Sequence, residues 1–155
     1  MINISYDIKE YRKQLFDIAN DGNVIVELGC HVGNTTKLIL DKFDNVKIIA
    51  IDNSPEAVGK MEKLADDYSN LTFISGDVRR HEILLEAFRL TQKCDVLSVD
   101  LGGGYHPDTV FKVFYIWSST FKPVHSIIRN KGLVDFCNSA VVRCEDFKSQ
   151  NGHLE

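Results

Sequence analysis

Acidic side chains stand at the ends of four successive apolar segments of the chain, at Glu27, Asp52, Asp77 and Asp100. A single carboxylate in such a place can simply cap the helix that follows. Four of them in corresponding places indicate a shared binding site. Carboxylates accept hydrogen bonds from ribose hydroxyls, and Asp52 lies 23 residues after Gly29. This distance is close to the spacing of about 20 residues at which an acid reaches a ribose in nucleotide-binding folds.

Strand and helix patterns alternate along the chain. We predict strands at 24–28, 46–51, 71–75, 94–100 and 124–128, and a short sixth strand at 140–144. Helices are predicted at 7–19, 37–43, 55–65, 82–90, 107–119 and 133–138. This order predicts a three-layer α/β/α sandwich, with an open, mainly parallel sheet and helices on both faces. Ligands of such sheets bind outside the carboxyl ends of the strands, where the four acidic residues and Asn130 would meet.

A turn bracketed by Gly29 and Gly33 follows the first of these strands and opens a helix. Glycine allows a ligand to approach the main chain closely, and the free N–H groups of a helix start would face the same ligand. A dinucleotide fingerprint needs a third glycine, which is missing here. Glu27 would repel a pyrophosphate but suits a cofactor with a positively charged amino-acid end. The pattern therefore favours S-adenosylmethionine over NAD.

These motifs together resemble those of class I S-adenosylmethionine-dependent methyltransferases. The segment 27–33, ELGCHVG, is similar to the first motif of that family, E/D-x-G-x-G-x-G. Segments 49–54, 75–78 and 99–100 resemble its second, third and fourth motifs, and the similarity covers about residues 23–130. The resemblance implies a Rossmann-like fold and a cofactor site formed by Glu27, Gly29, Cys30, His31, Gly33, Asp52, Asn53, Asp77 and Val78. Within that site it assigns the ribose to Asp52 and the adenine amino group to Asp77.

The chain departs from the family pattern at two places. His31 stands where the family has the middle glycine of its first motif, so the loop is expected to hold the methionine part of the cofactor differently. The family also ends in an antiparallel strand hairpin, of which only the strand at 140–144 is visible in the sequence. We therefore expect a small form of the fold that lacks part of this C-terminal hairpin.

Three residues near a glycine-rich loop are candidates for catalysis. Asp100, Tyr105 and His106 flank the glycines at 102–104, at the predicted active edge of the sheet. Methyl transfer mainly needs positioning of the two reactants, and a base only where the acceptor loses a proton. Our hypothesis is that His106 or Asp100 orients or deprotonates the acceptor. The alternative is that residues 106–108 merely begin a helix.

Composition places the chain among ordinary soluble domains. Its 155 residues predict one domain, 1–155, and the net charge of −4 disfavours a protein that mainly grips nucleic acid backbone. Apolar runs fall short of the roughly 20 residues that a membrane span needs, and no signal peptide is visible. The four cysteines lack CxxC spacing, which favours a reduced, cytoplasmic protein. His, Cys and acidic residues show no metal-ligand spacing, so we predict no metal.

The helix segment 110–117 carries apolar residues nearly all round, which predicts either a core helix or a helix with one side in a subunit interface, and we favour a homodimer. We predict a methyltransferase whose acceptor is RNA, protein or a small molecule. A second interpretation is a non-catalytic cofactor-binding or regulatory subunit of a larger partner. A nicotinamide-dependent oxidoreductase is the third, and the missing glycine and Glu27 disfavour it.

Overall fold

Six parallel strands form a single sheet at the centre of the computed structural model, which describes residues 1–102 and 106–143. The strands are β1 (Ile2–Ser5), β2 (Val24–Leu28), β3 (Lys47–Asp52), β4 (Leu71–Ser75), β5 (Val96–Val99) and β6 (His125–Arg129). Their order across the sheet is β1-β6-β5-β2-β3-β4, and every pairing between them is parallel. The predicted α/β class is therefore confirmed.

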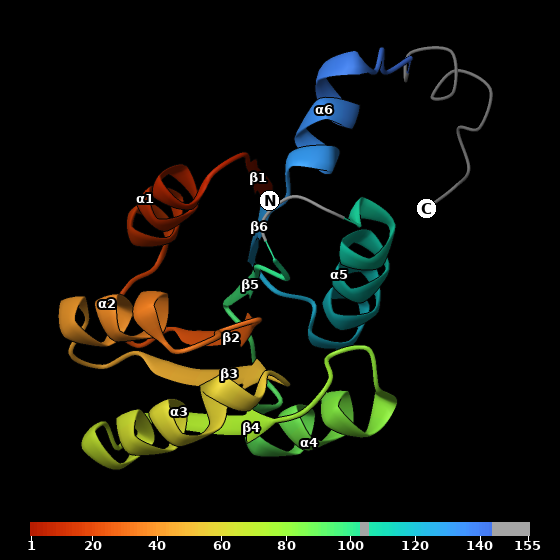
Figure 1. Cartoon of the computed structure of the whole chain (residues 1–155). Helices are drawn as coiled ribbons and strands as arrows, with labels where there is room; N and C mark the ends of the chain where they lie inside the picture. Colours follow the sequence, from red (N-terminus) through yellow and green to blue (C-terminus); the bar gives the residue numbers. More distant parts are fainter. Residues whose placement is uncertain (103–105, 144–155) are drawn as a thin grey trace.

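Helices cover both faces of this sheet, as Figure 1 shows. They are α1 (Ile8–Ile18), α2 (Asn34–Lys42), α3 (Pro55–Asp67), α4 (His81–Thr91), α5 (Pro107–Phe121) and α6 (Lys131–Ser139). The first three lie on one face, and α4 and α5 lie on the other. Helix α6 extends past the end of β6, and none of its residues is buried.

Alternation along the strands divides the apolar residues between two cores. In β2, Val26 and Leu28 face α4 and α5, whereas Ile25 faces α1, α2 and α3. All three side chains are fully buried, as expected for a central parallel strand that is covered on both faces. Glu27 shares the face of Ile25, so an acidic side chain is enclosed beneath the helices α1 and α2.

The N-terminal strand was missed by the sequence analysis. Residues 2–5 pair with β6 in parallel, with Ile4 opposite Ile128. Four residues of alternating apolar and polar type are too short a pattern to separate from a loop. Their pairing depends on β6, which lies more than a hundred residues away in the chain.

The predicted short strand at 140–144 is wrong for the residues that the structure describes. Residues 140–143 are exposed and form no strand, and Cys144 lies outside the described residues. The edge of β6 that such a strand could join already pairs with β1. Helix α6 also begins earlier than predicted, at Lys131, because the Asn130 side chain caps it by accepting a hydrogen bond from the Leu133 N–H at 2.9 Å.

Candidate functional site

A cavity of about 700 Å³ opens at the carboxyl ends of the strands, and we call it the strand-end cavity. The predicted residues Glu27, Gly29, Cys30, His31, Asp52, Asn53, Asp77, Val78, Asp100 and His106 all border it. This is the edge that the strand pattern predicts for a parallel sheet. Gly33 lies in the same turn, at the start of α2. Tyr105 lies outside the described residues.

The turn between β2 and α2 has a left-handed backbone at three positions, which lets a ligand approach the main chain closely. Gly29, His31 and Gly33 have φ angles of 85°, 49° and 83°, in the left-handed region that favours glycine. A Cβ on Gly29 would lie 2.0 Å from the carbonyl oxygen of Asp100, so only glycine fits there. Although His31 is not glycine, its backbone keeps the conformation that a glycine would adopt. The exception to the family motif therefore places a side chain on a left-handed backbone position.

Glu27 lies beneath this turn and is almost completely buried, with 2% of its surface exposed. The Thr36 hydroxyl donates a hydrogen bond to its carboxylate at 2.6 Å. Burial raises the pKa of Glu27 to about 7, and the nearby charges of Asp100 and Asp52 act in the same direction. The carboxyl group thus changes charge close to neutral pH, although model-peptide glutamates do so several pH units lower.

Asp52, at the end of β3, uses both carboxylate oxygens for contacts within the chain. One oxygen accepts a hydrogen bond from the backbone N–H of His31 at 2.8 Å. The other accepts from the N–H of Ser54 at 2.7 Å and from its hydroxyl at 2.5 Å. Asp52 therefore ties the glycine turn to the start of α3. Lone pairs remain on a carboxylate that accepts few bonds, so these contacts leave room for a ligand hydroxyl.

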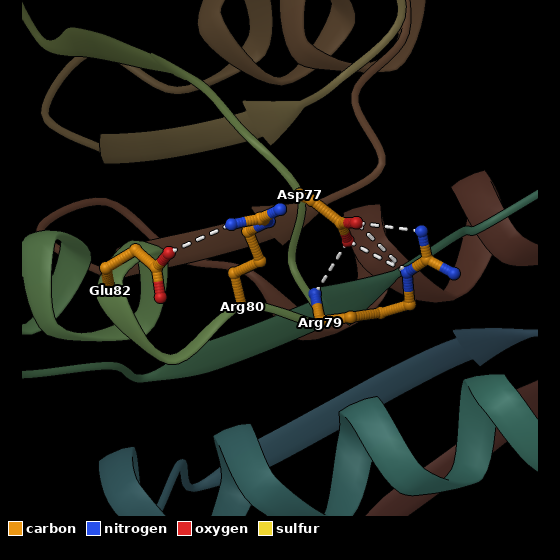
Figure 2. Close-up of polar contacts among 4 residues, drawn as sticks. All are labelled: Asp77, Arg79, Arg80 and Glu82. Carbon is orange, nitrogen blue, oxygen red and sulfur yellow. Dashed lines mark hydrogen bonds and ion pairs between the residues drawn. The ribbon is translucent and has the colours of Figure 1, made fainter.

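Asp77 follows β4 and is clasped by Arg79, as Figure 2 shows. The guanidinium group donates to both oxygens, with Nε at 3.0 and 3.1 Å and Nη2 at 2.8 Å. The backbone N–H of Arg79 adds a bond of 2.9 Å. These bonds hold the pKa of Asp77 below its ordinary value. The predicted adenine contact therefore competes with an arginine two residues along the chain.

Asp100 pairs with Arg129 of β6, where Oδ1 lies 2.9 Å from Nη2 and both side chains are largely shielded from solvent. His106 caps the start of α5 with a left-handed backbone and makes no side-chain cap hydrogen bond. The cavity thus has a cation beside its fourth carboxylate. An ion pair of this kind fixes the orientation of the aspartate, which suits positioning of a ligand.

Cys30 is also buried beside the glycine turn, with 5% of its surface exposed. Burial raises the pKa of its thiol above the ordinary value, so the sulfur stays protonated and unreactive. Its role at the cavity is therefore to pack.

Tyr11 and Arg12 of α1, Arg79 after β4 and Arg129 of β6 also border the cavity, and the sequence motifs did not predict them. Arg12 donates to the Thr35 hydroxyl at 3.0 Å, and Tyr11 is buried, which raises the pKa of its hydroxyl. Arg129 directly precedes Asn130, so the strand-end rule could have found it. No local signal places α1 against the cavity, because that contact depends on how the helix crosses β1 and β6.

Within the described residues, no group of three or more His, Cys, Asp and Glu side chains is arranged to hold a metal ion. The helices of that same part of the chain include none with the length and apolar character to cross a membrane.

Comparisons with known proteins agree with this fold. Residues 25–102 match the sequence profile of a methyltransferase domain family. Over 66 residues the chain is 33% identical to trans-aconitate 2-methyltransferase of Streptomyces avermitilis. The aligned segment covers 41% of this chain and 24% of that protein. The match thus spans about a quarter of the length of this curated relative.

Solved structures share the fold at low sequence identity. An rRNA methylase from Streptococcus thermophilus superposes with a TM-score of 0.59 at 13% identity, over 85% of this chain and 78% of that chain. Fibrillarin from Aeropyrum pernix, solved with natively bound S-adenosyl-L-methionine, gives a TM-score of 0.55 at 20% identity over 75% and 50% of the two chains. The architecture is that of a Rossmann-like methyltransferase. The chain belongs to the methyltransferase domain family, within the class I S-adenosylmethionine-dependent methyltransferases.

Proposed function

We propose that the strand-end cavity binds S-adenosylmethionine and that the protein transfers its methyl group to an acceptor. The observation that carries this proposal is the ring of carboxylates at successive strand ends around a turn that only glycine can build at Gly29. S-adenosylmethionine offers an amino group on adenine, two ribose hydroxyls and an ammonium group, and carboxylates are the natural acceptors for all of them. The volume of about 700 Å³ suits a cofactor of this size.

In this proposal each carboxylate has its own part of the cofactor. Asp52, with Asn53 beside it, accepts from the ribose hydroxyls. Asp77, with Val78, receives the adenine amino group, and Arg79 gives up part of its contact. Glu27 places negative charge beneath the turn that faces the methionine end. The backbone of that turn, formed by Gly29, Cys30, His31 and Gly33, lies along the same end.

The bound cofactor supplies a methyl group on a positively charged sulfur. The chain then needs to align the acceptor and to remove a proton where the acceptor carries one. We propose that Asp100 and His106 face the acceptor, and that Tyr105 is a third candidate from the adjacent loop. The ion pair with Arg129, 2.9 Å away, fixes the orientation of the Asp100 carboxylate, which favours a role in positioning the acceptor.

The same ion pair is the observation that keeps a second function open. A cofactor-binding subunit without activity of its own would need the glycine turn and the strand-end carboxylates but no free base. In that case a larger partner would supply the acceptor site. Transfer of methyl groups to an acceptor, whether RNA, protein or a small molecule, would distinguish the enzyme from the subunit. The oxidoreductase is disfavoured because Glu27 lies where a pyrophosphate would approach.

Isothermal titration calorimetry tests the cofactor. We expect S-adenosylmethionine and S-adenosylhomocysteine to bind and NAD to give no heat. Asp77→Asn should weaken binding about tenfold, because a charge-assisted hydrogen bond to adenine becomes a neutral one. Asp108→Asn, which changes an acid outside this cavity on α5, is the matched control and should bind as the wild type does.

Absence of binding by either sulfur compound would reject the proposal. Turnover is then measured as labelled methyl groups transferred to fractions of a cell extract. Binding without transfer to any fraction would favour the subunit over the enzyme.

We further propose that the chain forms one domain, 1–155, that acts in a reducing, cytoplasmic compartment. Support for one domain comes from the single sheet that the described strands share. Support for the compartment comes from Cys30 and Cys94, two buried thiols, and from Cys137, an exposed one, which are all free.

A further inference from the structure

A second cavity, of about 410 Å³, lies beside the strand-end cavity, and we call it the side cavity. It lies between the turn that links β4 to α4 and the side of α5 that carries Thr109, Lys112 and Ile116. Val78, Arg79 and Thr109 border both cavities, so a thin wall of side chains separates them. None of the proposed cofactor contacts needs the far part of the side cavity.

Cationic side chains surround the side cavity, although the whole chain has a net charge of −4. Arg79, Arg80 and His81 come from the turn, and Lys112 comes from α5. Figure 2 shows the two arginines extending in different directions from this turn, Arg79 to Asp77 and Arg80 to Glu82. Both guanidinium groups are well exposed, with 64% and 68% of their side chains accessible. The pair of Arg80 with Glu82 is exposed on both sides, so it exchanges partners at little cost.

Lys112 has an ammonium group that is available to bind an anion. It has no hydrogen bond or ion pair with any residue that the structure describes. Asp108 is the one acidic residue of the cavity wall, against three permanently charged cations. Helix α4 begins at this wall, and Arg80 caps it without a side-chain hydrogen bond. The helix start therefore adds partial positive charge to a wall that is already cationic.

The floor of the side cavity is apolar. Leu84, Val113 and Trp117 are almost fully buried there, and Ile116 is 41% exposed. The indole N–H of Trp117 donates to the carbonyl of Val78 at 2.8 Å, so its polar group is already satisfied. The exposed surface of Ile116, with the small accessible parts of its buried apolar neighbours, can then contact a flat, weakly polar group. A cationic wall over an apolar floor matches a ligand with an anionic end and an aromatic body.

We propose that the side cavity binds a nucleotide, with its phosphate between Lys112 and the two arginines and its base on the floor beside Trp117. The nucleotide is either free or one unit of an RNA strand, because both carry the same phosphate and base. The volume of the side cavity falls within the range of about 300 to 1,000 Å³ that is typical of small-ligand sites.

The experiment uses the fluorescence of Trp117, which is the single tryptophan of the chain and borders the side cavity. The full-length protein without cofactor is titrated with uridine 5′-monophosphate at low salt, and calorimetry follows the same titration. A pyrimidine avoids the proposed adenine contact at Asp77, so the result does not depend on the proposed function. We expect a saturable fluorescence change and measurable heat.

Variants test whether the ligand lies where we propose. Lys112→Ala should weaken binding about tenfold, because a charged hydrogen bond to phosphate is lost. Lys60→Ala removes an exposed lysine of α3, on the opposite face of the sheet, and should bind as the wild type does. A short uridine oligonucleotide distinguishes the sources. Affinity similar to that of the monophosphate indicates a free nucleotide, whereas tighter binding that falls steeply with salt indicates an RNA strand.

Two results would overturn the proposal. One is a titration in which neither the monophosphate nor the oligonucleotide gives heat or a fluorescence change. The other is binding that Lys112→Ala leaves unchanged or that S-adenosylmethionine displaces competitively, which would place the nucleotide in the strand-end cavity. Failure of S-adenosylmethionine to bind would count against the proposed function alone. The nucleotide titration, which is run without cofactor, would still decide whether the side cavity binds a nucleotide.

Discussion

Each carboxylate at the strand-end cavity has a different partner, and the partner decides what the carboxylate can still do. Glu27 accepts from a buried hydroxyl, Asp52 from the main chain, and Asp77 from an arginine two residues further along the chain. Asp100 is paired with a cation from another strand. Residue type and position therefore predict where a ligand can bind. The hydrogen bonds decide how strongly the chain itself competes for each group.

Glu27 provides a test at the scale of one residue. Its pKa is about 7 in the folded chain, well above the ordinary value of 4.5, because the carboxyl group is buried. Between these two pH values the folded state binds a proton that the unfolded state has lost, so the free energy of unfolding falls as the pH rises. Glu27→Gln removes this effect and should reduce the loss of stability between about pH 5 and about pH 8 by roughly 3 kcal/mol.

Urea unfolding at both pH values measures this difference for the wild type and for the variant. Glutamine keeps an oxygen that can accept from the Thr36 hydroxyl, so the comparison isolates the charge. An identical pH dependence in the two proteins would show that Glu27 does not titrate in this range.

At the scale of the element, the turn between β2 and α2 combines two separate demands on glycine. Gly29 needs a left-handed backbone, and it also lies against the carbonyl of Asp100. Its own N–H donates to the carbonyl of Ile51 at 2.9 Å, so the turn is held on the neighbouring strand. His31 meets only the first demand, which explains how a larger residue occupies a position that the family reserves for glycine.

Gly22 offers a matched control for these two demands. Its φ of 82° is nearly that of Gly29, but a Cβ there would have open space around it. Gly22→Ala should therefore lower the free energy of unfolding by about 1 kcal/mol, the cost of the left-handed backbone alone. Gly29→Ala should cost at least about 3 kcal/mol, because the backbone around Asp100 must also move. Equal losses in denaturant unfolding would refute the close approach.

At the scale of the whole molecule, the pairing of β1 with β6 bears on where a dimer interface can form. The strand predicted at 124–128, β6, pairs with β1 on one side and with β5 on the other, so it offers no free edge to a second copy of the chain. Apolar exposure is found on α5, where Phe111 and Tyr115 are 54% and 62% exposed and their rings lie 6.2 Å apart. The homodimer that we propose therefore uses α5, because large exposed rings on a small domain mark contact surfaces.

Light scattering after size exclusion tests this proposal. The wild type should show about twice the chain mass of 17.6 kDa, and Phe111→Ser with Tyr115→Ser should return it to the mass of one chain. Leu90→Ser changes an exposed apolar residue of α4 and is the control, which should leave the dimer intact. A wild-type mass of one chain would end the dimer proposal.

Much of the fold could be predicted from the sequence because its strongest patterns are local. Strands such as 24–28 and 71–75 are mainly apolar segments between turn residues, and the helices repeat apolar residues at helical spacing. Short segments with weak apolar patterns were not predicted correctly, because their structure depends on pairing with distant strands. Ile2–Ser5 is a strand because of a distant partner, and 140–143 is not a strand because that partner position is taken.

The sequence by itself determined the fold class, the edge of the sheet where the acidic residues meet and the glycine turn. It could do so because strand ends in a parallel sheet share one edge, whatever the details of packing. Only the tertiary structure decided which groups reach that edge from elsewhere, such as Tyr11, Arg12 and Arg129. Burial and long-range pairing also set the pKa of Glu27 and the ion pair of Asp100, because both depend on neighbours that no local pattern encodes.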